Sequence, residues 1–188
     1  MIDFTKSKQY TLSIRLSTDG FSFSIYNPIH DDSLSIIEKE IDTSLSLTAN
    51  LKAVFHESDF LNHPYKRVNI MMASKRFTIA PLDLFEEGQA ELLFYHNHQK
   101  RENETVLYNI LRKNNVAVIF GIDKSAQTFL NEQYPEARFY SQSTPFIDYF
   151  SVKSRLGNSK KMYASVRKDG IDIYCFCLLY TSPSPRDS

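Results

Sequence analysis

Apolar and polar residues alternate with a period of two on both sides of the dipeptide Asp19-Gly20. The alternation covers residues 12–16 and 21–25, and it is typical of two strands that each bury one face. Glycine tolerates the positive φ that a tight hairpin turn demands, so the segment predicts a β-hairpin near the start of the chain. The predicted inward positions are Leu12, Ile14, Leu16, Phe21, Phe23 and Ile25.

The same pattern returns late in the sequence, around Asp169-Gly170. When the two Asp-Gly turns are aligned, the predicted inward positions of the two hairpins coincide, although few residues are identical. Asp-Gly hairpins are common, so a chance repeat is the alternative. A hairpin that opens the chain and returns after several α/β elements favours a duplicated domain. Its predicted inward positions are Met162, Ala164, Val166, Ile171, Ile173 and Cys175.

The sequence between the hairpins mixes the periods of helices and strands, which predicts a mixed α/β fold. Asp123 is expected to cap the helix that follows it, and Thr144-Pro145 to open another. Gly88 weakens the helix pattern in which it lies. Strands are expected near 34–41 and over 68–72, 77–81, 106–111 and 116–120, and helices over 46–61 and 82–95.

Size and charge limit the classes of function. The 188 residues suffice for one domain, or for one domain and the start of another. The 22 basic and 22 acidic side chains leave no basic excess for a broad nucleic-acid surface. No run of about 20 apolar residues and no apolar signal segment is found, so we expect a cytoplasmic protein without a membrane anchor. The two cysteines are too few for a disulfide framework.

The last residues change abruptly to serine, proline and arginine. The string LLYTSPSPRD resembles the translation of a sequencing adapter. We therefore expect residues 178–188 to be an artefactual, unpacked tail and the natural chain to be interrupted near Phe176 or Cys177. A genuine Ser/Pro-rich disordered tail is the alternative.

Four segments carry a resemblance to a known family: LSIRLSTDGFSFSIYNP, SKRFTIAPLDLF, NVAVIFGIDKSAQTF and MYASVRKDGIDIYCF. They resemble a Bacteroidota family known as domain of unknown function three-eight-two-two, within the ribonuclease H-like superfamily of actin, FtsA and PilM. The resemblance implies an actin-like fold, longer family members and a truncated second domain here. We accordingly expect a first domain over 1–156, the first hairpin of a second domain over 157–177, and the tail.

The resemblance also directs attention to the two hairpin turns. Actin-like ATPases place an aspartate two residues before the turn glycine, where it helps to hold Mg²⁺, and a hydroxyl residue after that glycine. Here Thr18 and Phe21 stand at these positions in the first turn, and Lys168 and Ile171 in the second. Both turns depart from the ATPase pattern.

Asp19 and Asp169 lie next to the turn glycines, where aspartate suits the geometry of a turn. If a nucleotide binds at all, the residues to contact it are those of the two turns. They are Thr18, Asp19 and Gly20, and Lys168, Asp169 and Gly170.

Other polar groups give weaker signals. The pair His96 and His98 lacks further ligands at convincing spacing, so a solvated loop is favoured over a metal site. Glu86-Glu87 and the carboxylates of 102–104 are interpreted as surface groups. The scattered basic pairs are interpreted as charges that keep loops and edges soluble. They are Lys66-Arg67, Lys75-Arg76, Lys100-Arg101 and Arg112-Lys113.

These observations predict no catalytic residue, metal or cofactor. The first hypothesis is an interaction or scaffold protein, with an unidentified protein partner, on an actin-like fold whose ATPase chemistry has decayed. The second is a nucleotide-binding protein with unconventional phosphate contacts. A third is an RNA-associated factor that uses the basic pairs.

Overall fold

The computed structural model describes residues 2–29, 34–155, 161–167 and 170–176. The chain divides into two compact units, residues 1–144 and 145–188. The predicted domain boundary after residue 156 stays a prediction, and the predicted tail lies outside the described residues. Each unit is described by itself.

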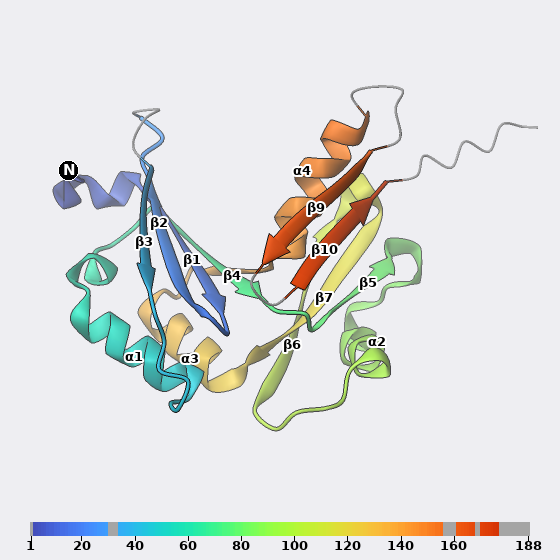
Figure 1. Ribbon diagram of the computed structural model, residues 1–188, viewed down its shortest axis with the longest axis horizontal. Helices are drawn as coiled ribbons and strands as arrows, with labels where there is room; N and C mark the ends of the chain where they lie inside the picture. Colours follow the sequence, from blue (N-terminus) through green and yellow to red (C-terminus); the bar gives the residue numbers. More distant parts are fainter. Residues whose placement is uncertain (1, 30–33, 156–160, 168–169, 177–188) are drawn as a thin grey trace, which may run out of the picture. The chain divides into compact units, whose positions relative to one another are not determined.

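The first unit contains a five-stranded mixed sheet, four strands of which are labelled at the left of Figure 1. The predicted first hairpin is confirmed, with Leu12 opposite Ile25 and Leu16 opposite Phe21. The neighbouring strand, β4, runs parallel to β1. The order is β3-β2-β1-β4-β8, with β1 at Thr11–Ser17, β2 at Gly20–Tyr26, β3 at Leu34–Lys39, β4 at Arg67–Ala73 and β8 at Arg138–Ser141.

Two helices lie side by side against this sheet, α1 at Leu47–Glu57 and α3 at Lys124–Gln133 (Figure 1). The predicted inward positions of the first hairpin are all buried in one core with residues of both helices. Ser46 caps α1 by accepting from the Ala49 N–H, and Asp123 caps α3 as predicted. Two 3-10 helices, η1 at Phe4–Gln9 and η2 at Asp59–Asn62, adjoin the same layer.

A second, three-stranded antiparallel sheet follows β4 in the chain. Its order is β5-β7-β6, and its antiparallel β6–β7 pair corresponds to the strands predicted over 106–111 and 116–120. Helix α2 buries Ala90 and Phe94 against this sheet. The strands are β5 at Phe77–Pro81, β6 at Glu104–Leu111 and β7 at Val116–Asp123, with η5 at Arg112–Asn114 in the β6–β7 turn and α2 at Ala90–Asn97.

The helix expected over 82–95 is wrong in its first half. Two short 3-10 helices precede α2, η3 at Leu82–Leu84 and η4 at Glu87–Gln89. The Leu82 N–H donates to the Asn115 carbonyl at 2.9 Å, which ties this segment to the β6–β7 turn. Gly88 lies in η4, where its low helix propensity disfavours a continuous α-helix.

The second unit contains the second hairpin, β9 at Met162–Arg167 and β10 at Gly170–Cys175, with Met162 opposite Cys175 as predicted. Helix α4 spans Ser143–Arg155, so Thr144 lies inside it and the prediction that Thr144 caps a helix starting at Pro145 is wrong. The part of α4 from residue 145 onward belongs to this unit. Tyr163 stacks on Phe150 with ring centroids 4.4 Å apart, so one face of the hairpin packs on α4.

The packed face is not the one predicted. The second hairpin buries Tyr174 and turns its predicted inward positions outward: Val166 is 75% exposed and Ile173 61%. The prediction that the two hairpins share inward positions is therefore wrong. Among the described helices, none is long and apolar enough to cross a membrane.

Candidate functional site

The first hairpin turn is held by its own side chains. The Ser17 hydroxyl contacts the Asp19 carboxylate and lies 2.9 Å from the Gly20 carbonyl oxygen, and the Asp19 N–H donates to the Ser17 Oγ at 3.3 Å. Gly20 has a φ of +148°, and a Cβ there would meet the Lys39 carbonyl oxygen at 2.9 Å. Asp19 therefore serves the turn, as an aspartate beside a turn glycine is expected to do.

A recess of about 340 Å³ lies beside this turn, at the ends of β1, β4 and β7. Thr18 lines it and is exposed. The polar side chains of the lining come from the strand ends, from the loops around them and from α1. They are Ser17, Thr18, Thr43, Asn50, Ser74, Arg76, Arg101, Glu104 and Asp123.

Arg76 and Glu104 form an ion pair in the wall of this recess. The Arg76 Nε donates to one Glu104 oxygen at 2.9 Å and its terminal nitrogen to the other at 2.7 Å, and the two side chains are only 15% and 8% exposed. The same terminal nitrogen donates to the Gln99 carbonyl at 2.8 Å. The guanidinium also lies 5.4 Å from the centre of the Phe94 ring. The pair thus joins the starts of β5 and β6, and its two opposite charges cancel.

The expectation that Glu104 is a solvated surface group is wrong. Gly121 of β7 leaves the room for its carboxylate, since a Cβ at this position would come within 2.5 Å of the Glu104 Oε1. A carboxylate that is this well buried needs a positively charged partner, because an unpaired buried charge is costly. Arg76, interpreted from the sequence as one of the loop charges, supplies it.

The remaining carboxylate of the recess, Asp123, is also engaged by the fold. One of its oxygens accepts from the Ala126 N–H at 2.8 Å and from the Thr48 hydroxyl at 3.3 Å, and the other accepts from the Asn103 amide at 2.8 Å. Asn103 has a φ of +56° and its carbonyl accepts from the Lys124 N–H at 2.8 Å. Asp123 therefore connects the start of α3 to Asn103, the residue before β6.

The loop on the α1 side is fixed by Asn50. Its amide oxygen accepts from the Asp42 N–H at 2.8 Å, and its amide nitrogen donates to the Asp42 and Ser46 carbonyls at 2.9 and 3.1 Å. The Ser44 hydroxyl and N–H both donate to the Asp42 carboxylate and lower its pKa. The polar side chains of this wall thus satisfy the backbone of residues 42–46.

We tested the recess against the Mg²⁺-nucleotide that actin-like ATPases bind. A metal of this kind needs oxygen ligands, usually carboxylates, that are available to it. Asp19, Glu104 and Asp123 already accept hydrogen bonds from the fold, and the residue two before the turn glycine is Thr18. The donor set does not fit a bound Mg²⁺.

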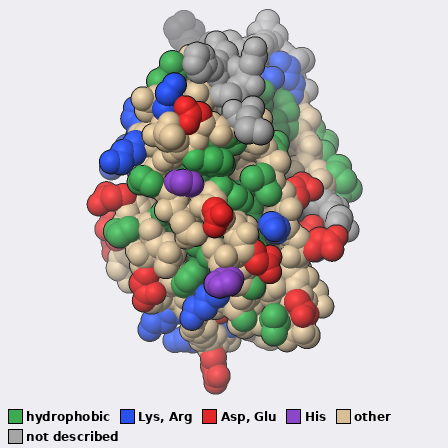
Figure 2. All heavy atoms as spheres, turned by 90° about the vertical axis from the view of Figure 1, so that its left-hand side faces the viewer, with side chains coloured by type: hydrophobic (Ala, Val, Ile, Leu, Met, Phe, Trp, Pro, Cys, Tyr) green, Lys and Arg blue, Asp and Glu red, His purple; other side chains and the backbone are tan. Residues whose placement is uncertain are grey.

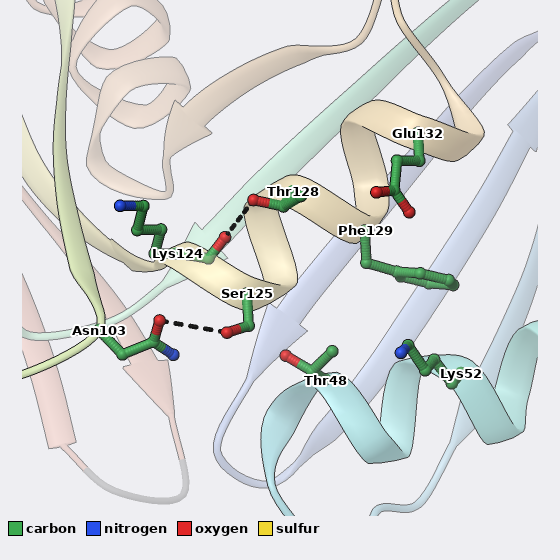
Figure 3. Close-up of a pocket in the computed structure, with 8 residues that line it drawn as sticks. All are labelled: Thr48, Lys52, Asn103, Lys124, Ser125, Thr128, Phe129 and Glu132. Carbon is green, nitrogen blue, oxygen red and sulfur yellow. Dashed lines mark hydrogen bonds between the residues drawn. The ribbon is translucent and has the colours of Figure 1, made fainter.

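A second recess, of about 440 Å³, lies between α1 and α3 (Figure 3). Three hydroxyls line it, and each donates within the protein: Thr48 to Asp123 at 3.3 Å, Ser125 to Asn103 at 3.1 Å and Thr128 to the Lys124 carbonyl at 2.9 Å. The charged lining residues, Lys52, Lys124 and Glu132, are of both signs. The recess offers no set of donors directed at an anion.

The other residues singled out from the sequence lie apart from these recesses or serve the fold. His98 donates through Nε2 to the Phe77 carbonyl at 3.1 Å, at the end of α2. Among the described residues, no group of three or more metal-ligating side chains gathers. In the second turn, Lys168 and Asp169 lie outside the described residues, and Gly170 begins β10.

The basic pairs do not form one surface. Lys66-Arg67 lies at the start of β4 and Lys75-Arg76 follows its end, and the two ends of this strand are about 20 Å apart at the rise of a strand. Figure 2 shows basic and acidic side chains interspersed on the face of the first unit that lies at the left of Figure 1. The distribution does not favour a phosphate backbone as ligand.

Sequence reasoning found the first turn but missed the residues that build the recess around it. The burial of Arg76 and Glu104 depends on side chains 28 positions apart in the chain. The hydrophobic pattern of the sequence does not reveal this pairing, because both residues lie at the start of a strand, close to other charged residues. Gly121, inside an otherwise apolar strand, was the one local indication that another group approaches the backbone there.

Comparisons with known proteins identify the family and the fold. The sequence matches the family described as Protein of unknown function (DUF3822) over residues 1–177. A crystal structure from Bacteroides thetaiotaomicron, described as a protein with actin-like ATPase fold and unknown function, is similar to the chain at 84% identity and a TM-score of 0.88. The match covers 94% of this chain and 68% of that one. A search of curated proteins finds no match.

Proposed function

Because the chain belongs to the family described as Protein of unknown function (DUF3822) and has an actin-like fold, we propose that it is a non-catalytic interaction or scaffold protein. One observation carries the proposal. An actin-like ATPase offers a metal-binding carboxylate at this turn. Here the nearby carboxylates of Asp19, Glu104 and Asp123 each accept hydrogen bonds from other groups of the protein. Phosphoryl transfer depends on metal ions and fixed donors that neutralise the phosphate oxygens.

The charge of the recess supports the same proposal. Two arginines and two carboxylates line it, and one arginine is neutralised by its own ion pair. An incoming triphosphate would face Glu104 and Asp123 without a surplus of positive charge. Replacing Glu104 as the partner of Arg76 would leave a mostly buried carboxylate unpaired, which is costly.

The proposal is tested by the thermal stability of the purified chain with ATP or ADP, with and without Mg²⁺. A ligand at about 100 times its Kd stabilises a protein by about 2.7 kcal/mol. At this chain length, that raises Tm by roughly 5–10 °C. We expect no shift with any of the four combinations. A Mg²⁺-dependent rise of Tm with either nucleotide that disappears in Thr18→Ala would contradict the proposal, because it would show nucleotide binding at the turn.

The second candidate is nucleotide binding with unconventional phosphate contacts, and the recess itself favours it. Thr18 and Arg101 are exposed in its lining, and both can donate to a phosphate. This candidate predicts a shift of Tm that does not need Mg²⁺ and that is lost in Arg101→Ala. The matched control is Arg112→Ala, an arginine of the β6–β7 turn outside the recess lining.

The proposed setting is the cytoplasm, with a protein as the partner. Both rest on the sequence, whose net charge is neutral and whose printed residues contain no apolar run of membrane length. The basic pairs give little support to RNA as a ligand, since Arg76 already forms an ion pair with Glu104.

A further inference from the structure

The two sheets that the structure describes in the first unit have four edges, and three of these edges are covered. Asn109 of β6 bonds to the backbone of β8 through its amide nitrogen at 2.9 Å and its amide oxygen at 3.0 Å, so these two edges face each other. At β5, the His98 ring lies 3.1 Å from the Phe77 carbonyl oxygen, and the strand ends in Pro81. Proteins cover or interrupt edges in this way because unpaired backbone groups bind other strands.

The fourth edge, at β3, is uncovered (Figure 1). The Lys39 carbonyl oxygen lies 2.9 Å from the position of a Cβ on Gly20, so Lys39 turns its carbonyl toward β2. Inward and outward backbone groups alternate along an antiparallel strand, which leaves those of Leu34, Ile36 and Glu38 directed away from the sheet. Among the described residues, none outside β2 hydrogen-bonds to the backbone of β3.

The side chains at this edge limit what can pair with it. Leu34 and Ile36 are 58% and 60% exposed, and Tyr26, beside Leu34 on β2, is 40% exposed. Glu38 is exposed on the same face and forms no ion pair with another described residue. The edge therefore presents two aliphatic side chains and then a carboxylate, at every second position.

A second copy of the chain is a poor occupant of this edge. When two β3 strands pair antiparallel about Ile36, each Glu38 lies opposite Leu34 of the other copy, so neither carboxylate meets a positive charge. Three apolar side chains, each about half exposed, also fall far short of the roughly 800 Å² per partner that a stable dimer buries. A single extended segment needs less apolar area, because its main chain supplies hydrogen bonds along the edge.

We propose that the β3 edge binds an extended segment of a partner protein, antiparallel to β3, with a basic residue followed by apolar residues two and four positions later. The basic residue lies opposite Glu38, and the apolar residues lie opposite Ile36 and Leu34. Opposite charges and apolar pairs across two strands stabilise the pairing and give it selectivity. This inference rests on the proposed interaction role and names the kind of partner that the role involves.

The probe is a labelled peptide with the acetylated sequence Lys-Thr-Val-Thr-Ile, whose binding to the purified chain is measured by fluorescence anisotropy. In the proposed pairing, the N–H groups of its valine and isoleucine point at β3, and those of its two threonines point away. N-methylation of the valine and isoleucine should weaken binding at least about tenfold, because it removes two donors from the edge. N-methylation of the two threonines is the matched control and should have little effect.

Glu38→Lys reverses the charge at the edge and leaves the backbone unchanged. It should weaken binding of this peptide about fivefold and strengthen binding of Glu-Thr-Val-Thr-Ile by a similar factor. The control variant Glu91→Lys, at an exposed position of α2, should change neither affinity.

Three results would overturn the proposal: equal losses from the two N-methylated peptides, an unchanged peptide preference in Glu38→Lys, or self-association of the chain that the peptide displaces. The last result would make a second copy the occupant. Absence of peptide binding, with no Tm shift caused by nucleotide, would overturn this inference alone and leave the proposed function in place.

Discussion

At the scale of single residues, Gly20 shows how the first turn constrains the sequence. Its φ of +148° and the approach of the Lys39 carbonyl exclude a side chain without movement of the backbone. We predict that Gly20→Ala lowers the free energy of unfolding by about 1–3 kcal/mol, the usual cost of a residue in a sparsely populated conformation. Urea denaturation measures this loss.

Gly88→Ala is the matched control for this substitution. Nothing lies within 4 Å of the position that its Cβ would take. The control should leave stability unchanged or raise it slightly, because alanine restricts the unfolded chain more than glycine does. Equal effects of the two substitutions would contradict the assigned geometry of the turn.

Asp123 was identified from the sequence as a helix cap, and the structure confirms that role. We predict that Asp123→Ala lowers the free energy of unfolding by about 0.5–2 kcal/mol, the range for the loss of a capping side chain. Asp123→Asn keeps an acceptor for the Ala126 N–H and should retain most of the stability. A loss in the asparagine variant as large as in the alanine variant would show that the negative charge matters more than the cap.

Tyr65 links the stability of the first unit to alkaline pH. Burial raises its pKa to about 12, and its hydroxyl donates to the Phe60 carbonyl at 2.6 Å. Burial also raises the pKa of Tyr134, whose hydroxyl donates to the Leu61 carbonyl at 2.5 Å. Both phenols are therefore protonated in the folded protein at a pH where they ionise in the unfolded chain.

The raised pKa fixes the sign of the effect. The contribution of Tyr65 is fully present below the unfolded pKa of about 10 and is lost as the pH rises toward 12. Denaturation at pH 8 to 12 should show a steeper loss of stability in the parent than in Tyr65→Phe, which has no proton to lose. Identical slopes would contradict the assigned burial of this hydroxyl.

At the scale of elements, the ion pair of Arg76 and Glu104 connects β5 to β6. We predict that Glu104→Ala destabilises the protein by about 3 kcal/mol, since it leaves a mostly buried guanidinium without its partner. The double replacement Arg76→Met with Glu104→Leu should cost clearly less than the sum of its single replacements. A double-mutant cycle by chemical denaturation measures the coupling, and additive effects would contradict a buried pair.

Elements with a strong periodic pattern could be predicted from the sequence, and those defined by distant contacts could not. Both hairpins and most other strands were predicted, because every second residue carries the information. Strand β8 was missed, since four residues are too few for a period. The early start predicted for α2 failed because the β6–β7 turn holds the segment around Leu82.

The face of the second hairpin illustrates a further limit. Its alternation correctly gave two strands and their register, but it could not say which face packs on α4, because Tyr163 and Tyr174 are also apolar in their rings. The candidate site had the same limit. The turn residues were found from their spacing, whereas the engagement of Asp123 and Glu104 depends on partners brought together by folding.

At the scale of the whole molecule, the chain combines an actin-like fold with a first turn that carries Thr18 two residues before its glycine, where actin-like ATPases place a metal-binding aspartate. The fold is shared with a protein that is likewise described as of unknown function. The recess at the first turn lies wholly within residues 16–123, so its chemistry can be assessed on the chain as it stands.

The most direct test of the central claim is phosphate release from ATP in the presence of Mg²⁺. The purified chain, its Thr18→Ala variant and the longer Bacteroides thetaiotaomicron relative are measured side by side with a protein-free blank. The account predicts that none of the three releases phosphate above the blank. Phosphate release by the chain that falls in the Thr18→Ala variant would contradict the account, because it would place phosphoryl transfer at the turn.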